Sequence, residues 1–271
     1  MQFRSHRMKE CWLQVVIASV LSVTVSVGNL IAAPATERLF EKVLPLVPPA
    51  QSAPEELQVV AGDRIVAIGD SITAEGSYLR YIEQVLAANY PALRNLRIVS
   101  AGMSGYRSEN LVSRFDVDVL ARQPTIVIIN IGINDVWLRL KEPAKAEVVL
   151  AYRENLTKLV AQAQHAGIHV ILLSPTILQE DPNSEGNLRL ASYAAAMGTV
   201  AHSQRCQFVN LRMMFLHALE TRTAEKKQWL TSDGIHMQPL GSAIMALGVL
   251  RALGVPDTKI AATEIVVSQS R

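Results

Sequence analysis

The chain has 271 residues, of which 49% are hydrophobic and 18% charged, and its formal net charge is +2 at pH 7. This length and apolar content suffice for one domain with a sizeable hydrophobic core. The nearly balanced charge gives no indication that nucleic acid or an acidic polymer is a partner.

The N-terminal segment predicts export. It begins with three basic residues, Arg4, Arg7 and Lys9. An apolar stretch follows over 11–27, and Ala33-Pro34-Ala35 then offers the small residues that a signal peptidase reads. We therefore expect residues 1–35 to be a signal peptide of a secreted or periplasmic protein, with no stable membrane insertion after cleavage. The alternative is an uncleaved anchor, because the stretch approaches the roughly 20 residues that span a bilayer.

Cleavage before Thr36 would leave a formally neutral chain with one cysteine, Cys206, which cannot form an internal disulfide. Because Cys206 opens an apolar run, we expect it to be a buried small hydrophobic residue rather than a reactive thiol. Residues 36–62 contain four prolines and are predicted to be a proline-rich lead-in or linker.

The remaining chain alternates between predicted strands and helices. Strands are expected at 64–69, 96–101, 125–131, 168–174 and 206–211. Helices are expected near 76–89, 108–122, 144–166, 186–204 and 239–253. Such alternation is typical of an α/β fold with a parallel sheet covered on both faces, here a domain over 63–253. Residues 254–271 form a predicted tail, in which 264–267 could add an edge strand.

Ser71 follows the first predicted strand in the sequence Gly69-Asp70-Ser71-Ile72. A serine at this point lies at the carboxyl edge of the sheet, where open α/β sheets bind ligands. Its backbone N–H lies at the start of the next helix, where it can donate a hydrogen bond to a developing negative charge. The alternative is that Ser71 simply caps the next helix.

Two further loops lie at the same predicted edge. The strand at 125–131 is followed by Gly132 and Asn134, whose carboxamide could donate to an oxyanion. The strand at 96–101 is followed by Gly105, where the absence of a side chain lets a backbone N–H approach a substrate. Each could instead be an ordinary turn residue.

Asp233 and His236 are three positions apart, so one turn or tight loop can bring their side chains together. A serine nucleophile needs a base, and a histidine base needs a group that orients it. Alternatively, Asp233 caps the helix that begins near Pro239, or the two residues are metal ligands. No third ligand stands nearby, and we interpret His165 and His169 as surface or packing residues.

Together these segments resemble the SGNH (or GDSL) hydrolase family over roughly Asp63 to Leu253. Its motifs are matched by Gly69-Asp70-Ser71-Ile72, Gly105, Gly132-Ile133-Asn134-Asp135 and Asp233-Gly234-Ile235-His236. One departure is that Met237 and Gln238 stand where the family often has proline. The resemblance implies a three-layer αβα sandwich with a flavodoxin-like, five-stranded parallel sheet of order 2-1-3-4-5.

The same resemblance implies a serine esterase with catalytic Ser71, Asp233 and His236. Its oxyanion hole would be formed by Ser71, Gly105 and Asn134, and no metal or organic cofactor would be needed. Asp70 and Asp135 are interpreted as structural.

For the substrate, a small-molecule or glycan ester, we favour short-chain esters, particularly O-acetyl groups on carbohydrate. The alternatives are a lipolytic acyl hydrolase of lysophospholipase or thioesterase type, and a catalytically silent binding module. Tyr106 and Trp137 are candidate pocket residues, although Trp137 could equally belong to the core or a lid. The loop at 175–187 is expected to shape the substrate side. The sequence carries no signal for the oligomeric state.

Overall fold

The computed structural model describes residues 35–49, 54–221 and 229–267, and Ala35–Arg271 form one compact unit. Residues 1–34, which hold nearly all of the predicted signal peptide, lie outside the described residues. No helix in the described ranges is long and apolar enough to cross a membrane.

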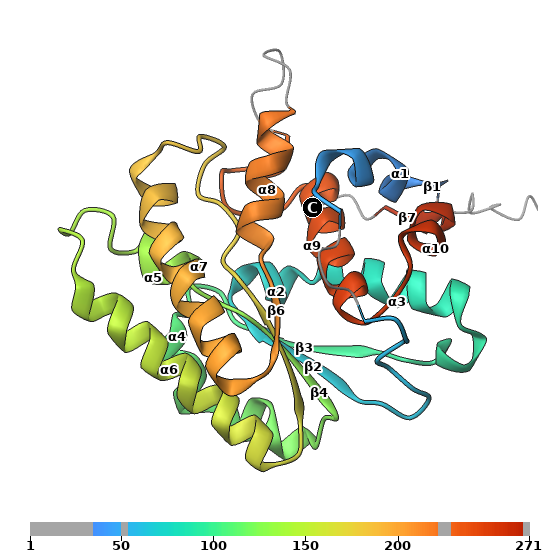
Figure 1. Cartoon of the computed structure of the whole chain (residues 1–271), viewed down its shortest axis with the longest axis horizontal. Helices are drawn as coiled ribbons and strands as arrows, with labels where there is room; N and C mark the ends of the chain where they lie inside the picture. The colour runs from blue at the N-terminus through green and yellow to red at the C-terminus, as the bar shows by residue number, and fades with distance from the viewer. Residues whose placement is uncertain (1–34, 50–53, 222–228, 268–271) are drawn as a thin grey trace, which may run out of the picture. The chain divides into compact units, whose positions relative to one another are not determined.

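The centre of this unit is a five-stranded parallel sheet (Figure 1). Its strands are β2 (Ile65–Gly69), β3 (Ile98–Gly102), β4 (Ile126–Asn130), β5 (His169–Leu173) and β6 (Gln207–Val209). They are arranged in the order β3-β2-β4-β5-β6, and all four neighbouring pairs run parallel. In chain order this is 2-1-3-4-5, so the predicted topology is confirmed.

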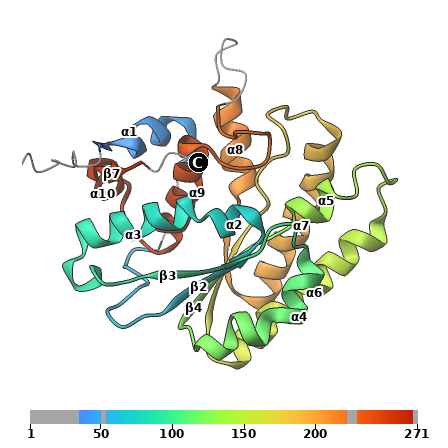
Figure 2. The ribbon, with the colours of Figure 1, turned by 180° about the vertical axis from the view of Figure 1, so that it is seen from behind.

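Helices cover both faces of the sheet (Figures 1 and 2). One face carries α4 (Ser108–Asp118), α6 (Ala146–His165) and α7 (Glu185–Gln204), which pack on one another in that order. The other face carries α3 (Ser77–Asn89) and α9 (Pro239–Ala252), which pack together, with α8 (Leu211–Glu220) beside α9. The predicted three-layer αβα sandwich is therefore confirmed.

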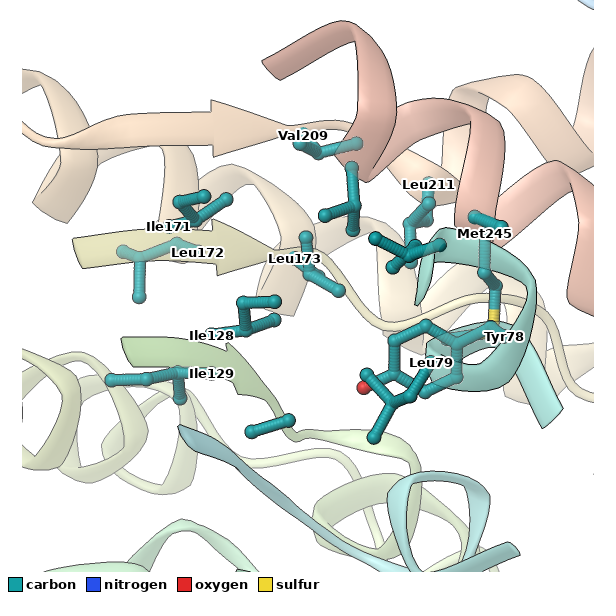
Figure 3. Close-up of a cluster of buried hydrophobic side chains, with 14 of the residues drawn as sticks. Tyr78, Leu79, Ile128, Ile129, Ile171, Leu172, Leu173, Val209, Leu211 and Met245 are labelled. Atoms are coloured by element: carbon teal, nitrogen blue, oxygen red, sulfur yellow. The ribbon is translucent and has the colours of Figure 1, made fainter. Parts of the chain in front are cut away.

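The central strands are buried because they are apolar on both faces, as a sheet sandwiched between helices requires. Every residue of β2 and β4 is buried. Figure 3 shows the result beside α3, where Ile128 and Leu173 of adjacent strands lie near Tyr78 and Met245.

The structure differs from the predicted elements in several places. Two helices, α5 (Ile133–Trp137) and α8, were not predicted, and the helix expected over 108–122 ends at Asp118. Two junctions also differ. The strand expected at 206–211 ends at Val209, because Asn210 caps α8 by accepting a hydrogen bond from the Met213 N–H at 3.1 Å. The helix expected from residue 76 is preceded by a separate short helix, α2 (Ser71–Glu75). Gly76, at φ 65°, ends α2 in the left-handed conformation that favours glycine.

Both segments outside the predicted domain pack on it. In the lead-in, α1 (Leu39–Val43) buries three apolar side chains and contacts α9. The tail contributes α10 (Asp257–Ala262) and β7 (Ile265–Val266). The possible edge strand at 264–267 forms as β7, but it pairs antiparallel with β1 (Thr36–Glu37) in a separate two-stranded sheet.

Candidate active site

The register of the sheet brings the predicted site residues to one edge. Gly69, the last residue of β2, pairs with Gly102 of β3 and with Asn130 of β4. The three strands therefore end at the same level. Ser71, Gly105 and Asn134 follow these ends within a few residues.

Ser71 is the first residue of α2 and is partly exposed. The turn into α2 is tight and leaves no room for a side chain at Gly69, where a Cβ would clash with the Thr73 hydroxyl of α2 and with the backbone oxygen of Asn130. Asp70 then caps the helix by accepting a hydrogen bond from the Ile72 N–H at 3.1 Å. This local geometry holds the Ser71 side chain at the edge of the sheet.

Hydrogen bonds join Ser71 to the two residues predicted as its partners. The Ser71 Oγ lies 2.9 Å from His236 Nε2, and His236 Nδ1 lies 2.7 Å from Asp233 Oδ2. A carboxylate can only accept, so Nδ1 carries the proton and Nε2 is left to accept from the serine hydroxyl. The other oxygen of Asp233 accepts the backbone N–H groups of Ile235 and His236.

Asp233 and His236 lie in a tight loop, and α9 begins only at Pro239. The Ser232 N–H donates to the His236 carbonyl at 2.8 Å, and Thr231 pairs with Met237 in an antiparallel bridge. The departure from the family pattern after the histidine is accommodated here: Met237 is buried, and the Gln238 N–H donates to the Leu230 carbonyl at 2.9 Å.

The loop that follows β3 and the helix that follows β4 are linked beside Ser71. The Met103 N–H donates to the Gly69 carbonyl at 3.0 Å, and Asn134 Nδ2 donates to the Tyr106 carbonyl at 3.1 Å. Gly105 lies between these contacts, exposed and at φ 78°. Since a carboxamide has two N–H groups, Asn134 keeps a second one for another acceptor.

The two candidate pocket residues have different surroundings. The Tyr106 hydroxyl accepts a hydrogen bond from Arg114 of α4 at 3.0 Å, so its side chain is held against α4. Trp137 ends α5 (Ile133–Trp137), one turn after Asn134, and is 39% exposed.

Asp135 is buried beside Asn134. Its carboxylate accepts hydrogen bonds from the Ser108 N–H and, at 2.8 Å, from the Ser108 hydroxyl. These bonds tie α5 to the start of α4, which agrees with the structural role predicted for Asp135.

Charges around the imidazole favour its protonated form. Partial burial by itself lowers the pKa of His236, but the hydrogen bond and charge of Asp233, with a smaller contribution from Glu75, raise it above its usual value. Burial likewise tends to raise the pKa of Asp233, but its hydrogen bonds from His236 and Ile235 bring that pKa below the usual range. Burial raises the pKa of Asp70 to about 7.

Two carboxylates at the site were missed by the sequence analysis. Glu75 Oε1 lies 3.9 Å from His236 Nε2, one helical turn after Ser71. Glu180, in the loop after β5, accepts hydrogen bonds from the chain just before Asp233. The spacing of Glu75 after Ser71 could have indicated the first contact, whereas no local pattern links Glu180 to residues about 50 positions away.

Among the residues that the structure describes, no group of three or more His, Cys, Asp or Glu side chains could hold a metal ion. Cys206 is half-buried next to β6, and burial raises the pKa of its thiol to about 11.

Comparison with known proteins identifies relatives of this chain. The profile of the GDSL-like lipase/acylhydrolase family matches residues 67–244. The acetylxylan esterase of Geobacillus stearothermophilus is 30% identical over 216 residues, covering 73% of this chain and 97% of that protein. The uncharacterized lipoprotein YqeF of Bacillus subtilis (strain 168) is 32% identical over 116 residues, 41% of this chain and 47% of that protein.

Solved structures agree. Axe2, the acetylxylan esterase of Geobacillus stearothermophilus, matches with a TM-score of 0.66 and 28% identity, covering 74% of this chain and 98% of that one. LAE5, an α/β hydrolase from the metagenome of Lake Arreo, Spain, matches with a TM-score of 0.66 and 29% identity over 74% and 99%. Catalytic mutants of Axe2 replace one serine, one aspartate and one histidine, the last two being three positions apart.

Proposed function

Because this chain belongs to the GDSL-like lipase/acylhydrolase family, we propose that it uses Ser71 to remove acetyl groups from the hydroxyls of a carbohydrate. The chain is a carboxylic ester hydrolase. The observation that carries the assignment of its nucleophile is the hydrogen-bonded series from Ser71 through His236 to Asp233. The acetylxylan esterase relative, which the chain matches over nearly its whole length, supports the choice of acyl group and alcohol.

Acylation begins when the Ser71 hydroxyl attacks the ester carbonyl carbon and His236 Nε2 takes the hydroxyl proton. Asp233 stabilises the imidazolium and keeps its Nδ1 proton in place. Negative charge develops on the carbonyl oxygen, which accepts hydrogen bonds from the Ser71 and Gly105 backbone N–H groups and from the second N–H of Asn134. The intermediate then collapses, the C–O bond to the alcohol breaks, and the imidazolium returns the proton to the departing alcohol oxygen.

Deacylation repeats these steps with water as the nucleophile. His236 removes a proton from water, the hydroxide attacks the acetyl carbonyl, and the bond to Ser71 Oγ breaks as His236 returns the proton to the serine. The products are acetate and the free alcohol, and the enzyme is regenerated. No redox change occurs.

The substrate is tested by comparing acyl chain lengths on one leaving group and by measuring acetate release from sugars. The chain from Thr36 onward should hydrolyse 4-nitrophenyl acetate faster than the butyrate and much faster than the octanoate, and should release acetate from acetylated xylo-oligosaccharides. A preference for octanoate would move the assignment to a lipolytic acyl hydrolase. A folded protein that hydrolyses none of these esters would favour the binding module.

Replacing Asn134 with alanine tests the oxyanion hole. We expect kcat for 4-nitrophenyl acetate to fall by about 10²–10³-fold with a small change in KM, because the lost donor acts on charge that develops in the transition state. Steady-state kinetics of Asn134→Ala measures this split. An unchanged kcat would exclude Asn134 from the oxyanion hole.

Export is the final part of the proposal, and it is supported by the basic, apolar and Ala-Pro-Ala segments of residues 1–35. N-terminal sequencing of the protein recovered from the periplasm or medium should show that the mature chain begins at Thr36. A full-length, membrane-bound product would instead identify an uncleaved anchor.

A further inference from the structure

One carboxylate outside the catalytic series is surrounded by donors from the chain that leads into Asp233. Glu180 Oε1 accepts the N–H groups of Leu230 and Thr231, both at 2.7 Å, and the Thr231 hydroxyl at 2.9 Å. The N–H of Trp229 lies 3.0 Å and 2.9 Å from the two carboxylate oxygens. Three successive backbone N–H groups therefore converge on one anion.

These donors depend on Glu180 because their surroundings are largely dry. Leu230 and Thr231 have no exposed surface. A buried N–H that loses its acceptor bears the full cost of desolvation, and hydrogen bonds to a charged acceptor are stronger than those between neutral groups. The backbone at 229–231 is thus tied to the position of the Glu180 carboxylate.

The residue beside Glu180 holds the other side of the same loop. The Gln179 N–H donates to the carbonyl of Gly234, between Asp233 and His236, at 2.7 Å. Gln179 adopts φ 55°, a left-handed conformation that costs a non-glycine residue energy. Two successive residues therefore contact the same loop: Glu180 binds it before Asp233, and Gln179 binds it between Asp233 and His236.

The loop after β5 is itself fixed to a long helix. Asn187 of α7 is fully buried, and its side chain accepts the Leu178 N–H at 3.0 Å and donates to the carbonyls of Leu178 and Asp181, both at 2.7 Å. A continuous series of hydrogen bonds therefore runs from α7 through residues 178–181 to the loop that carries the base.

We propose that Glu180 is a positioning residue that sets the distance and angle of His236 relative to Ser71 by holding residues 229–231. This inference rests on the proposed function, in which His236 moves the protons. Glu180 acts through the geometry of the loop. The Ser232 N–H donates to the His236 carbonyl and closes the loop, so a shift at 229–231 displaces the imidazole. A displacement of about 1 Å at such a group can cost about 10²-fold in rate.

The test compares Glu180→Ala, which removes every acceptor, with Glu180→Gln, which keeps the shape but places an amide NH₂ among N–H donors. For 4-nitrophenyl acetate we expect kcat to fall by about 10- to 100-fold in Glu180→Ala and by less in Glu180→Gln, with little change in KM. Glu185→Gln is the matched control and should leave activity unchanged. Glu185 is an exposed residue at the start of α7 that pairs with Arg189.

A second readout needs no substrate. The imidazole signal of His236 in NMR spectra, identified by its absence from His236→Ala, reports the pKa that the charged groups around it set, namely Asp233, Glu75 and Asp70. If Glu180 positions the loop, Glu180→Ala weakens the contact between His236 and Asp233 and shifts this titration to lower pH.

The outcomes distinguish a failure of the positioning role of Glu180 from a failure of the proposed function. A lower melting temperature with unchanged kcat and an unmoved His236 titration would overturn the inference and leave Glu180 a purely structural residue. If the wild-type protein hydrolyses no ester, the proposed function fails, and the titration of His236 in Glu180→Ala and Glu180→Gln still decides whether Glu180 positions it.

Discussion

Replacing Ser71 with alanine is expected to lower kcat for 4-nitrophenyl acetate on the order of 10⁴–10⁶-fold, because no other group in the proposed mechanism can form the acyl-enzyme. The substitution removes one hydroxyl from a partly exposed side chain, so the melting temperature should stay close to that of the wild type. Initial-rate kinetics and a thermal melt on the same preparations measure both quantities.

Ser113→Ala is the control for the Ser71 variant. Ser113 is exposed on α4, and its hydroxyl donates only to a backbone carbonyl of the same helix. Intact mass after brief exposure to an organophosphonate adds a direct assignment, since Ser113→Ala and the wild type should gain one adduct and Ser71→Ala none. Turnover that survives in Ser71→Ala would mean that another residue is the nucleophile.

Most strands and helices could be predicted because their signals are local, whereas the order of the strands came from the family resemblance. The runs 64–69 and 125–131 are apolar at nearly every position, which is the pattern of strands buried on both faces. The junction after β6 is harder to predict, because a single polar residue, Asn210, separates the apolar end of the strand from Leu211, the first residue of α8. The capping contact of Asn210 with Met213 marks the start of the helix there.

The site could be predicted in part for a related reason. Parallel strands bring their carboxyl ends to one edge, and the strand order implied by the family resemblance makes the first three strands neighbours, which places Ser71, Gly105 and Asn134 together. The contact of His236 with Ser71 spans 165 positions. Its prediction depends on the family resemblance, because no local pattern links the two residues.

The residues that hold the loop of His236 could not be predicted. The loop at 175–187 was expected to shape the substrate side, and the structure shows that Glu180 and Gln179 bind the loop that carries His236. An isolated glutamate in a surface loop resembles any solvated charge. Its role becomes visible only when the folded chain brings three N–H groups to it.

Replacing Asp233 with asparagine is expected to lower kcat by up to about 10⁴-fold while the protein remains folded. The amide oxygen of asparagine can still accept the N–H groups of Ile235 and His236, so the loop keeps its shape. The amide NH₂ then faces His236 Nδ1, which must become the acceptor. The ring proton moves to Nε2, and this tautomer cannot accept the proton of Ser71.

The pH dependence of kcat/KM gives a second measurement on Asp233→Asn, independent of the fall in kcat. His236 must be neutral to act as a base, so activity rises with pH through the pKa of His236, which in the wild type lies above its usual value of about 6.5. Removing the negative charge of Asp233 lowers that pKa, so the acid limb should move to lower pH while the plateau falls. Glu75, 3.9 Å from Nε2, remains and should keep part of the shift. Asp116→Asn, an exposed change on α4, should alter neither the limb nor the plateau. A lowered plateau with an unmoved limb would mean that Asp233 acts on the fold of the loop rather than on the charge of His236.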